Sequence, residues 1–356
     1  MASPVDWRFA ERVALRFSGS EPFAASYHAE SLVPDFEELT REAEELVART
    51  TGLRSLAGPA RAQVVDRAAW IRANLASFQR LLRPLLDKVD DRTGRSMPAT
   101  LASKITAAQV GTLLGWMSGR VLGQYDLLVV DDDTADSQDL VYYVGPNLLN
   151  LEKRFGFPPR EFRLWIALHE CTHRAQFTGV PWLREHFLGL VRQAVDLVDP
   201  DPDRLVDTLK GALSAARGGR RALDEGGLVH LLATPEQRSV LNDIGGLMSL
   251  LEGHGDVTMD RAAAERVPSA ERFARVLRER RRNQHGVARV VQRLLGIEAK
   301  LAQYEAGERF IAAVEAAAGP TAVDRCWEGP ANLPTMEEIR APERWLSRMG
   351  VDSAVA

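Results

Sequence analysis

The sequence has few cysteines, no long apolar run and no strong excess of charge. Its 356 residues include only Cys171 and Cys326, too few and too far apart for a disulfide framework, so we expect reduced thiols. No stretch of 18 or more uncharged apolar residues occurs, which argues against a membrane span. The formal net charge of -4 provides no overall attraction to nucleic acid. We therefore expect neither a membrane nor a nucleic acid as partner.

The first residues also lack the uninterrupted apolar core of a secretory signal, because Asp6, Arg8 and Glu11 fall inside it. A cytoplasmic protein is expected on this ground. Hydrophobic residues make up 45% and charged residues 26%, as in an ordinary globular protein long enough for one large domain or two. No internal repeat is visible, and nothing in the composition indicates an oligomeric state.

Helical periodicity runs through most of the chain, with apolar residues three and four positions apart. Alanine, arginine, leucine and glutamate, which favour helices, fill many of the other positions. The sequence therefore predicts a mainly α protein. The predicted helices are Phe36 to Thr50, Ala60 to Val89, Leu101 to Leu122, Pro159 to Phe177, Leu183 to Val198, Asp203 to Ala216, Pro235 to Leu251, Ser269 to Arg282 and Val287 to Ala318.

One segment breaks this helical pattern. Asp126 to Val130 and Leu140 to Val144 are rich in β-branched and aromatic residues, and an acidic, turn-forming stretch separates them. They predict a small β-hairpin. Because two strands alone are marginally stable in water, we expect the hairpin to pack against helices or to accept a further strand.

Four glycines recur every fourth residue in the helix predicted before this hairpin. Gly111, Gly115, Gly119 and Gly123 would remove the side chains from one stripe of that helix, at a cost in helix stability at each position. Another part of the molecule must then approach the stripe closely. We expect close packing against a second helix.

The motif that indicates chemistry is His169-Glu170-Cys171-Thr172-His173, an HExxH sequence on the predicted helix that begins at Pro159. His169 and His173 lie one turn apart on the apolar stripe, so both rings can reach one metal ion. Glu170 would lie beside that ion, where a carboxylate can take a proton from a water molecule made acidic by zinc. Cys171 should face away from the metal.

A catalytic zinc site needs a third protein ligand, and one known pattern is absent. HExxHxxGxxH would require Gly at position 176 and His at 179, but the chain has Gln176 and Gly179.

We predict Glu252 as the third ligand, at the end of another apolar helical stripe. Asp256, one turn later, would accept the outer N–H of a ligand histidine. His254 is the alternative: it would point away on an intact helix, but the glycines beside it could break the helix and make it a ligand or a substrate contact.

With the segments His169 to His173 and Glu252 to Asp256, the chain resembles the actinobacterial zincin-like metallopeptidases. Members of this family are often labelled as hydrolases associated with deazaflavin coenzyme biosynthesis. The site is also similar to that of gluzincin peptidases, which combine HExxH with ExxxD. The similar segments span nearly the whole chain: Val5 to Trp7, Val144 to Asn147, Phe162 to Trp165, Gln176 to Leu183, Leu251 to His254, Lys300 to Tyr304 and Leu333 to Thr335.

The resemblance implies one zincin-like unit over residues 1–356 with additional helices, a zinc ion as cofactor and a peptide or related amide as substrate. We divide this unit into a helical part at 1–123, a catalytic core at 124–260 and a helical part at 261–356. The predicted function is hydrolysis by a zinc-activated water, with Glu170 as general base. The rival hypotheses are a non-catalytic zinc protein, with the fourth metal position closed, and an inactive zincin.

Overall fold

The computed structural model describes residues 5–21, 23–92, 99–127, 139–197, 234–264, 266–282 and 297–351. The chain divides into two compact units, Met1–Pro181 with Thr258–Arg280, and Trp182–Val257 with Arg281–Ala356. These divisions do not coincide with the predicted boundaries after residues 123 and 260. The region after Thr258 joins the first unit because Phe273 packs in a buried aromatic cluster with Phe157 and Phe162.

The described part of the chain is mainly α, as predicted, with one small sheet. Five predicted helices lie within four residues of their expected ends, whereas the helix expected to end at Leu251 continues to Ala263 and the one expected from Ala60 begins at Arg67. The first unit contains helices α1 (Trp7–Phe17), α2 (Tyr27–Glu30), α3 (Leu32–Thr51), α4 (Arg67–Arg92), α5 (Ala99–Ser118), α6 (Gly145–Phe155), α7 (Pro159–Gly179) and α13 (Ala270–Arg282). We did not predict α1, α2 or α6. For α6 the start is marked by a proline in its first turn, a position where the missing N–H costs nothing.

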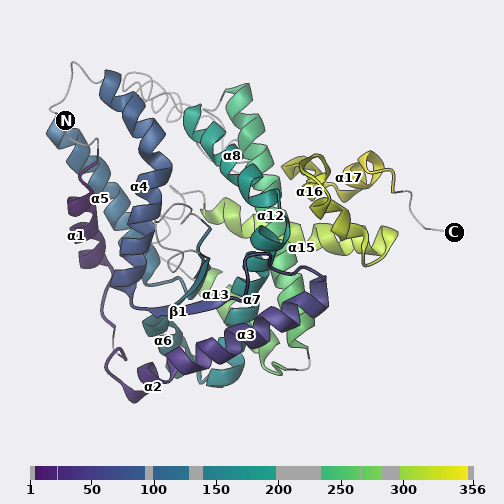
Figure 1. The fold of residues 1–356 in the computed structure, drawn as a ribbon, viewed down its shortest axis with the longest axis horizontal. Helices are drawn as coiled ribbons and strands as arrows, with labels where there is room; N and C mark the ends of the chain where they lie inside the picture. Colours follow the sequence, from purple (N-terminus) through teal and green to yellow (C-terminus); the bar gives the residue numbers. More distant parts are fainter. Residues whose placement is uncertain are drawn as a thin grey trace. The chain divides into compact units, whose positions relative to one another are not determined.

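Helices α1, α4 and α5 pack side by side at the N-terminal end of the first unit (Figure 1). Two glycines of α5 make the closest approach, since a Cβ on Gly111 or Gly115 would lie 2.4 Å from a backbone oxygen of α1. The predicted close helix packing is therefore confirmed for these two positions. It is wrong for the other two, because α5 ends at Ser118 and leaves Gly119 and Gly123 outside the helix.

The sheet has three strands in the order β1-β3-β2, with bounds Arg61–Val65, Leu140–Val144 and Gly123–Tyr125. β2 pairs antiparallel with β3, and β1 adds to the other side of β3 in parallel. The expected further strand is thus β1. Its residues had been assigned to the helix predicted at Ala60 to Val89, and this was wrong. Two adjacent valines favour the extended backbone, and Asp66 begins α4 by accepting the N–H of Ala69 at 2.6 Å.

The first strand of the predicted hairpin was also misplaced. The Asp126 N–H still donates to the Leu140 oxygen at 3.0 Å, but the Leu127 N–H turns back to the Tyr125 oxygen at 3.1 Å. This tight turn ends β2 at Tyr125, so the strand lies at residues 123–125, and residues 126 and 127 of the predicted strand follow it. The end of the predicted strand, residues 128–130, lies outside the described residues.

The second unit contains α8 (Leu183–Asp196), most of α12 (Pro235–Ala263), α15 (Ile297–Ala318) and a C-terminal group of short helices, α16 (Met336–Arg340) and α17 (Pro342–Arg348), preceded by the 3-10 turns η2 (Ala322–Trp327) and η3 (Pro330–Asn332). Figure 1 shows the C-terminal helices gathered around α15. Their apolar side chains form one buried cluster around Phe310 and Trp345. The predicted helix at 203–216 and the start of the one at 287–318 lie outside the described residues.

Helix α12 continues without a break through Gly253, and the reason for its glycines is packing. A Cβ on Gly253 would lie 2.4 Å from the carbonyl carbon of Gly307 on α15, and one on Gly307 would lie 1.9 Å from the Ser249 oxygen. The two helices therefore cross at a point where neither has a side chain. Among the described residues, no helix is long and apolar enough to cross a membrane.

Candidate metal centre

Helix α7 carries the HExxH motif through the interior of the first unit. It begins with a proline, and nearly all of its side chains from Phe162 to Phe177 are buried. His169 and His173 are exceptions, being half-buried on one face. A helix held so firmly by its neighbours can present two imidazoles in a defined direction.

The two histidines already have the spacing of a pair of metal ligands. Their Nε2 atoms lie 3.1 Å apart, and the ring planes are nearly perpendicular, at 88°. Two nitrogens about 2.05 Å from a tetrahedral zinc ion would be about 3.3 Å from each other. The spacing of the two nitrogens is therefore close to that of two zinc ligands.

Gln176 lies against the second histidine. Its amide oxygen, which can only accept, lies 3.0 Å from Nδ1 of His173. This contact favours the tautomer with the hydrogen on Nδ1, which leaves on Nε2 the lone pair that a metal needs. Gln176 itself is fully buried, so the contact is held in place. We did not predict this role from the sequence. The spacing of three residues could have indicated it, because it places Gln176 on the same helix face as His173.

Glu170 lies on a different side of α7, against the sheet. Its side chain is buried, and Oε2 accepts the backbone N–H of Tyr125 on β2 at 3.0 Å. Gly123, on the same strand, leaves room for the carboxylate. The glutamate of the motif is therefore held by the edge of a strand. The residues around Glu170 in the sequence do not predict this contact.

Among the described residues, His169 and His173 of the first unit and Glu252 of the second are the side chains that could together supply three ligands to a metal ion. Glu252 lies on α12 and is 9% exposed. It comes less than two helical turns before Thr258, the residue at which the first unit resumes in the sequence. Two imidazole nitrogens and one carboxylate oxygen are a donor set that suits zinc and leaves one position for water.

His254 and Asp256 do not belong to this group. Because α12 is intact, His254 projects from another side of the helix than Glu252, and its buried ring packs edge-on against Trp327, with centroids 5.1 Å apart. Asp256 is half-buried one turn after Glu252. The expected hydrogen bond from Asp256 to a ligand histidine stays a prediction.

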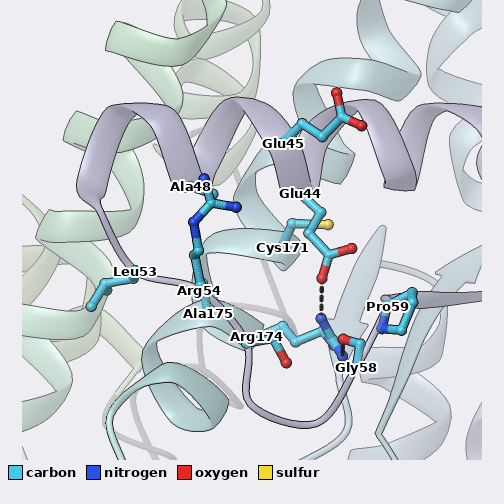
Figure 2. A pocket seen from close by; sticks show the side chains of 11 residues that line it. Glu44, Glu45, Ala48, Leu53, Arg54, Gly58, Pro59, Cys171, Arg174 and Ala175 are labelled. Carbon is cyan, nitrogen blue, oxygen red and sulfur yellow. Dashed lines mark hydrogen bonds and ion pairs between the residues drawn. The ribbon is translucent and has the colours of Figure 1, made fainter.

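Cys171 lies on the side of α7 opposite the histidines, as expected. Its thiol is buried with Sγ 3.6 Å from the Thr40 oxygen, and burial raises the pKa of this thiol far above its ordinary value. A pocket of about 270 Å³ opens on this side between α3, α7 and residues 53–59 (Figure 2). The thiol is not a candidate nucleophile, because almost none of it ionises near neutral pH.

The same pocket contains a buried arginine that fixes the back of α7. Arg174 is paired with Glu44 of α3 at 2.5 Å and with Asp139, just before β3, also at 2.5 Å, and it donates to the Gly58 oxygen. Figure 2 shows the pair with Glu44. Asp139 has a positive φ of 57°, which few non-glycine residues adopt. The ion pairs hold α7 between a helix and a strand.

Comparison with known proteins decides which family this site belongs to. The model of the zincin-like metallopeptidase family matches residues 5–346. The chain belongs to the zincin-like metallopeptidase family. Nearly the whole chain takes part in the match, so the additional helices belong to the family pattern. The resemblance inferred from the motifs is confirmed to that extent.

A solved structure is also similar to this zincin-like chain. It is that of a presumed hydrolase with a novel fold from Chloroflexus aurantiacus, with 33% sequence identity and a TM-score of 0.72, over 98% of this chain and 100% of that one. No curated protein matches the chain. Family and neighbour together support a hydrolase. These comparisons do not confirm the actinobacterial and deazaflavin labels of the family that the sequence resembles.

Proposed function

We propose that this protein is a zinc-dependent hydrolase of peptide or related amide bonds. The observation that carries the proposal is the pair of Nε2 atoms 3.1 Å apart on α7, and we propose the carboxylate of Glu252 as the third ligand. Membership of the zincin-like metallopeptidase family supports both the metal and the substrate class. A zinc ion held by His169, His173 and Glu252 would polarise the substrate carbonyl and lower the pKa of a water molecule.

Glu170 supplies the proton transfers in this proposal. It follows His169 directly in the sequence, and β2 holds its carboxylate, so it does not compete with the histidines for the metal. As general base it takes a proton from the attacking water, and as general acid it delivers that proton to the leaving nitrogen. The Tyr125 N–H on β2 holds the Glu170 carboxylate against the strand, directed away from α7.

The substrate in this proposal binds along β2. β3 is the central strand, so of the two predicted hairpin strands only β2 lies at an edge of the sheet. A peptide that pairs with this edge through backbone hydrogen bonds has to take over the Tyr125 N–H from the Glu170 carboxylate. The contact between Tyr125 and Glu170 places this edge directly beside the proposed general base.

Zinc content tests the metal site. We expect about one zinc per chain in the wild type by mass spectrometry after zinc loading, and loss of most of it in His169→Ala and Glu252→Ala. Glu236→Ala is the matched control, because this glutamate is exposed at the start of the same helix and should keep the metal. Full zinc in Glu252→Ala would show that Glu252 is not the third ligand.

Turnover tests the mechanism. A library of quenched-fluorescent peptides would identify a cleaved sequence, and Glu170→Gln should then lose about 10²- to 10⁴-fold in kcat while it keeps its zinc. Glutamine preserves the size of the side chain but cannot act as a base. Wild-type activity in this variant would exclude Glu170 as general base. Zinc binding without any cleavage by the wild type would favour the non-catalytic zinc protein.

A further inference from the structure

Gly123 occupies an unusual place on the edge strand β2. Gln124 pairs with Tyr142 of β3, and the Val144 N–H donates to the Leu122 oxygen at 2.9 Å. In an antiparallel pair, alternate residues direct their backbone groups away from the partner strand. Gly123 and Tyr125 therefore face outward, toward the side on which Glu170 lies.

The carboxylate of Glu170 fills the space that a side chain at position 123 would need. A Cβ on Gly123 would lie 2.6 Å from Cγ, 2.7 Å from Oε1 and 2.8 Å from Cδ of Glu170. Such distances are far inside van der Waals contact. The conflict begins at Cγ, so a rotation of the carboxylate end alone would not remove it.

No requirement of the backbone explains a glycine here. Gly123 does not have a positive φ, and glycine in a strand reduces stability unless something approaches closely. The earlier glycines of the stripe show the contrast: Gly111 and Gly115 admit the backbone of α1, whereas a Cβ on Gly119 would make only ordinary contacts. At Gly123 the approaching group is the side chain of the proposed general base.

We propose that Gly123 is a positioning residue for Glu170. The missing side chain lets the carboxylate lie flat against β2, and the Tyr125 N–H then holds Oε2 at 3.0 Å. Any larger residue at 123 displaces the carboxylate from this place. The catalytic consequence rests on the function proposed above, whereas the contact itself does not.

Selective labelling makes the contact observable without metal or substrate. The chain has only five tyrosines, so ¹⁵N-tyrosine labelling yields five backbone amide signals, and Tyr125→Phe identifies the one of interest. An amide that donates to a carboxylate resonates downfield. We expect Glu170→Gln and Gly123→Ala each to move the Tyr125 signal upfield. Gly119→Ala, the matched control four residues away, should leave it in place.

The kinetic part of the test uses zinc-loaded protein and a peptide that the wild type cleaves. Gly123→Ala should keep its zinc and its KM but lose about 10²-fold in kcat, the effect of misplacing a catalytic group by about 1 Å. Gly119→Ala should behave as wild type. An unchanged amide signal and unchanged kcat in Gly123→Ala would overturn the proposal. If the signal moves as expected but the wild type cleaves nothing, the contact is supported and only the proposed function fails.

A double variant covers the case in which Gly123→Ala folds poorly. If the alanine conflicts with Glu170, then Glu170→Ala in the same chain removes the conflict, and Gly123→Ala/Glu170→Ala should unfold at the same urea concentration as Glu170→Ala alone. A double variant as unstable as Gly123→Ala would show that the alanine disturbs the packing of the strand in general, and would overturn the proposal.

Discussion

Successive residues of α7 have different surroundings because each is rotated by about 100° from the last. His169 and His173 share one face, Glu170 faces the strand edge, and Cys171 packs on the opposite side against α3. One turn of helix thus combines metal ligands, a base and core packing. Each of these side chains has a fixed partner, so single substitutions should have separable effects.

The contact between Gln176 and His173 should control metal affinity. Gln176→Leu removes the acceptor for Nδ1, so the ring loses its fixed tautomer and orientation, and we expect zinc affinity to fall about 10- to 100-fold. Competition with a chromophoric chelator measures this. Gln176→Glu, which still accepts the hydrogen, should retain most of the affinity. Equal zinc affinity in the leucine and wild-type proteins would contradict the assignment.

At the scale of elements, glycine marks the places where helices approach most closely. The crossing of α12 and α15 depends on Gly307, whose added Cβ would lie 1.9 Å from the Ser249 oxygen. The glycines of α12 do not break that helix, contrary to one of the alternatives left open by the sequence. The helix therefore runs uninterrupted through Glu252.

Gly307→Ala should therefore destabilise the second unit. Because the obstacle is backbone and not a flexible side chain, we expect a loss of about 1–3 kcal/mol or more in the free energy of unfolding, measured with urea. Gly189→Ala on α8 is the control. Nothing lies within 4 Å of its added Cβ, so helix propensity should leave it as stable as the wild type or up to about 1 kcal/mol more stable. Equal stability of the two variants would show that the crossing is looser than described.

At the scale of the whole molecule, the proposed ligands lie far apart in the sequence, on α7 and α12. Zinc that binds them must stabilise the folded chain, because the unfolded chain cannot hold the three groups together. At a free zinc concentration 100 times Kd the gain is about 2.7 kcal/mol. We expect Tm to rise with zinc in the wild type and in Glu170→Gln, but not in His173→Ala. A similar rise in all three proteins would show that zinc acts elsewhere.

The sequence by itself determined the helical class and the spacing of the two histidines on one helix face, because these depend on local periodicity and on spacings of three and four residues. It placed the sheet only in part: a strand of five residues at 61–65 was absorbed into a neighbouring helix, since short apolar runs suit either conformation. Only the tertiary structure placed Tyr125 against Glu170, 45 residues later, and Gly123 beside the same carboxylate. Contacts between distant segments depend on how elements pack, and no local pattern encodes that packing.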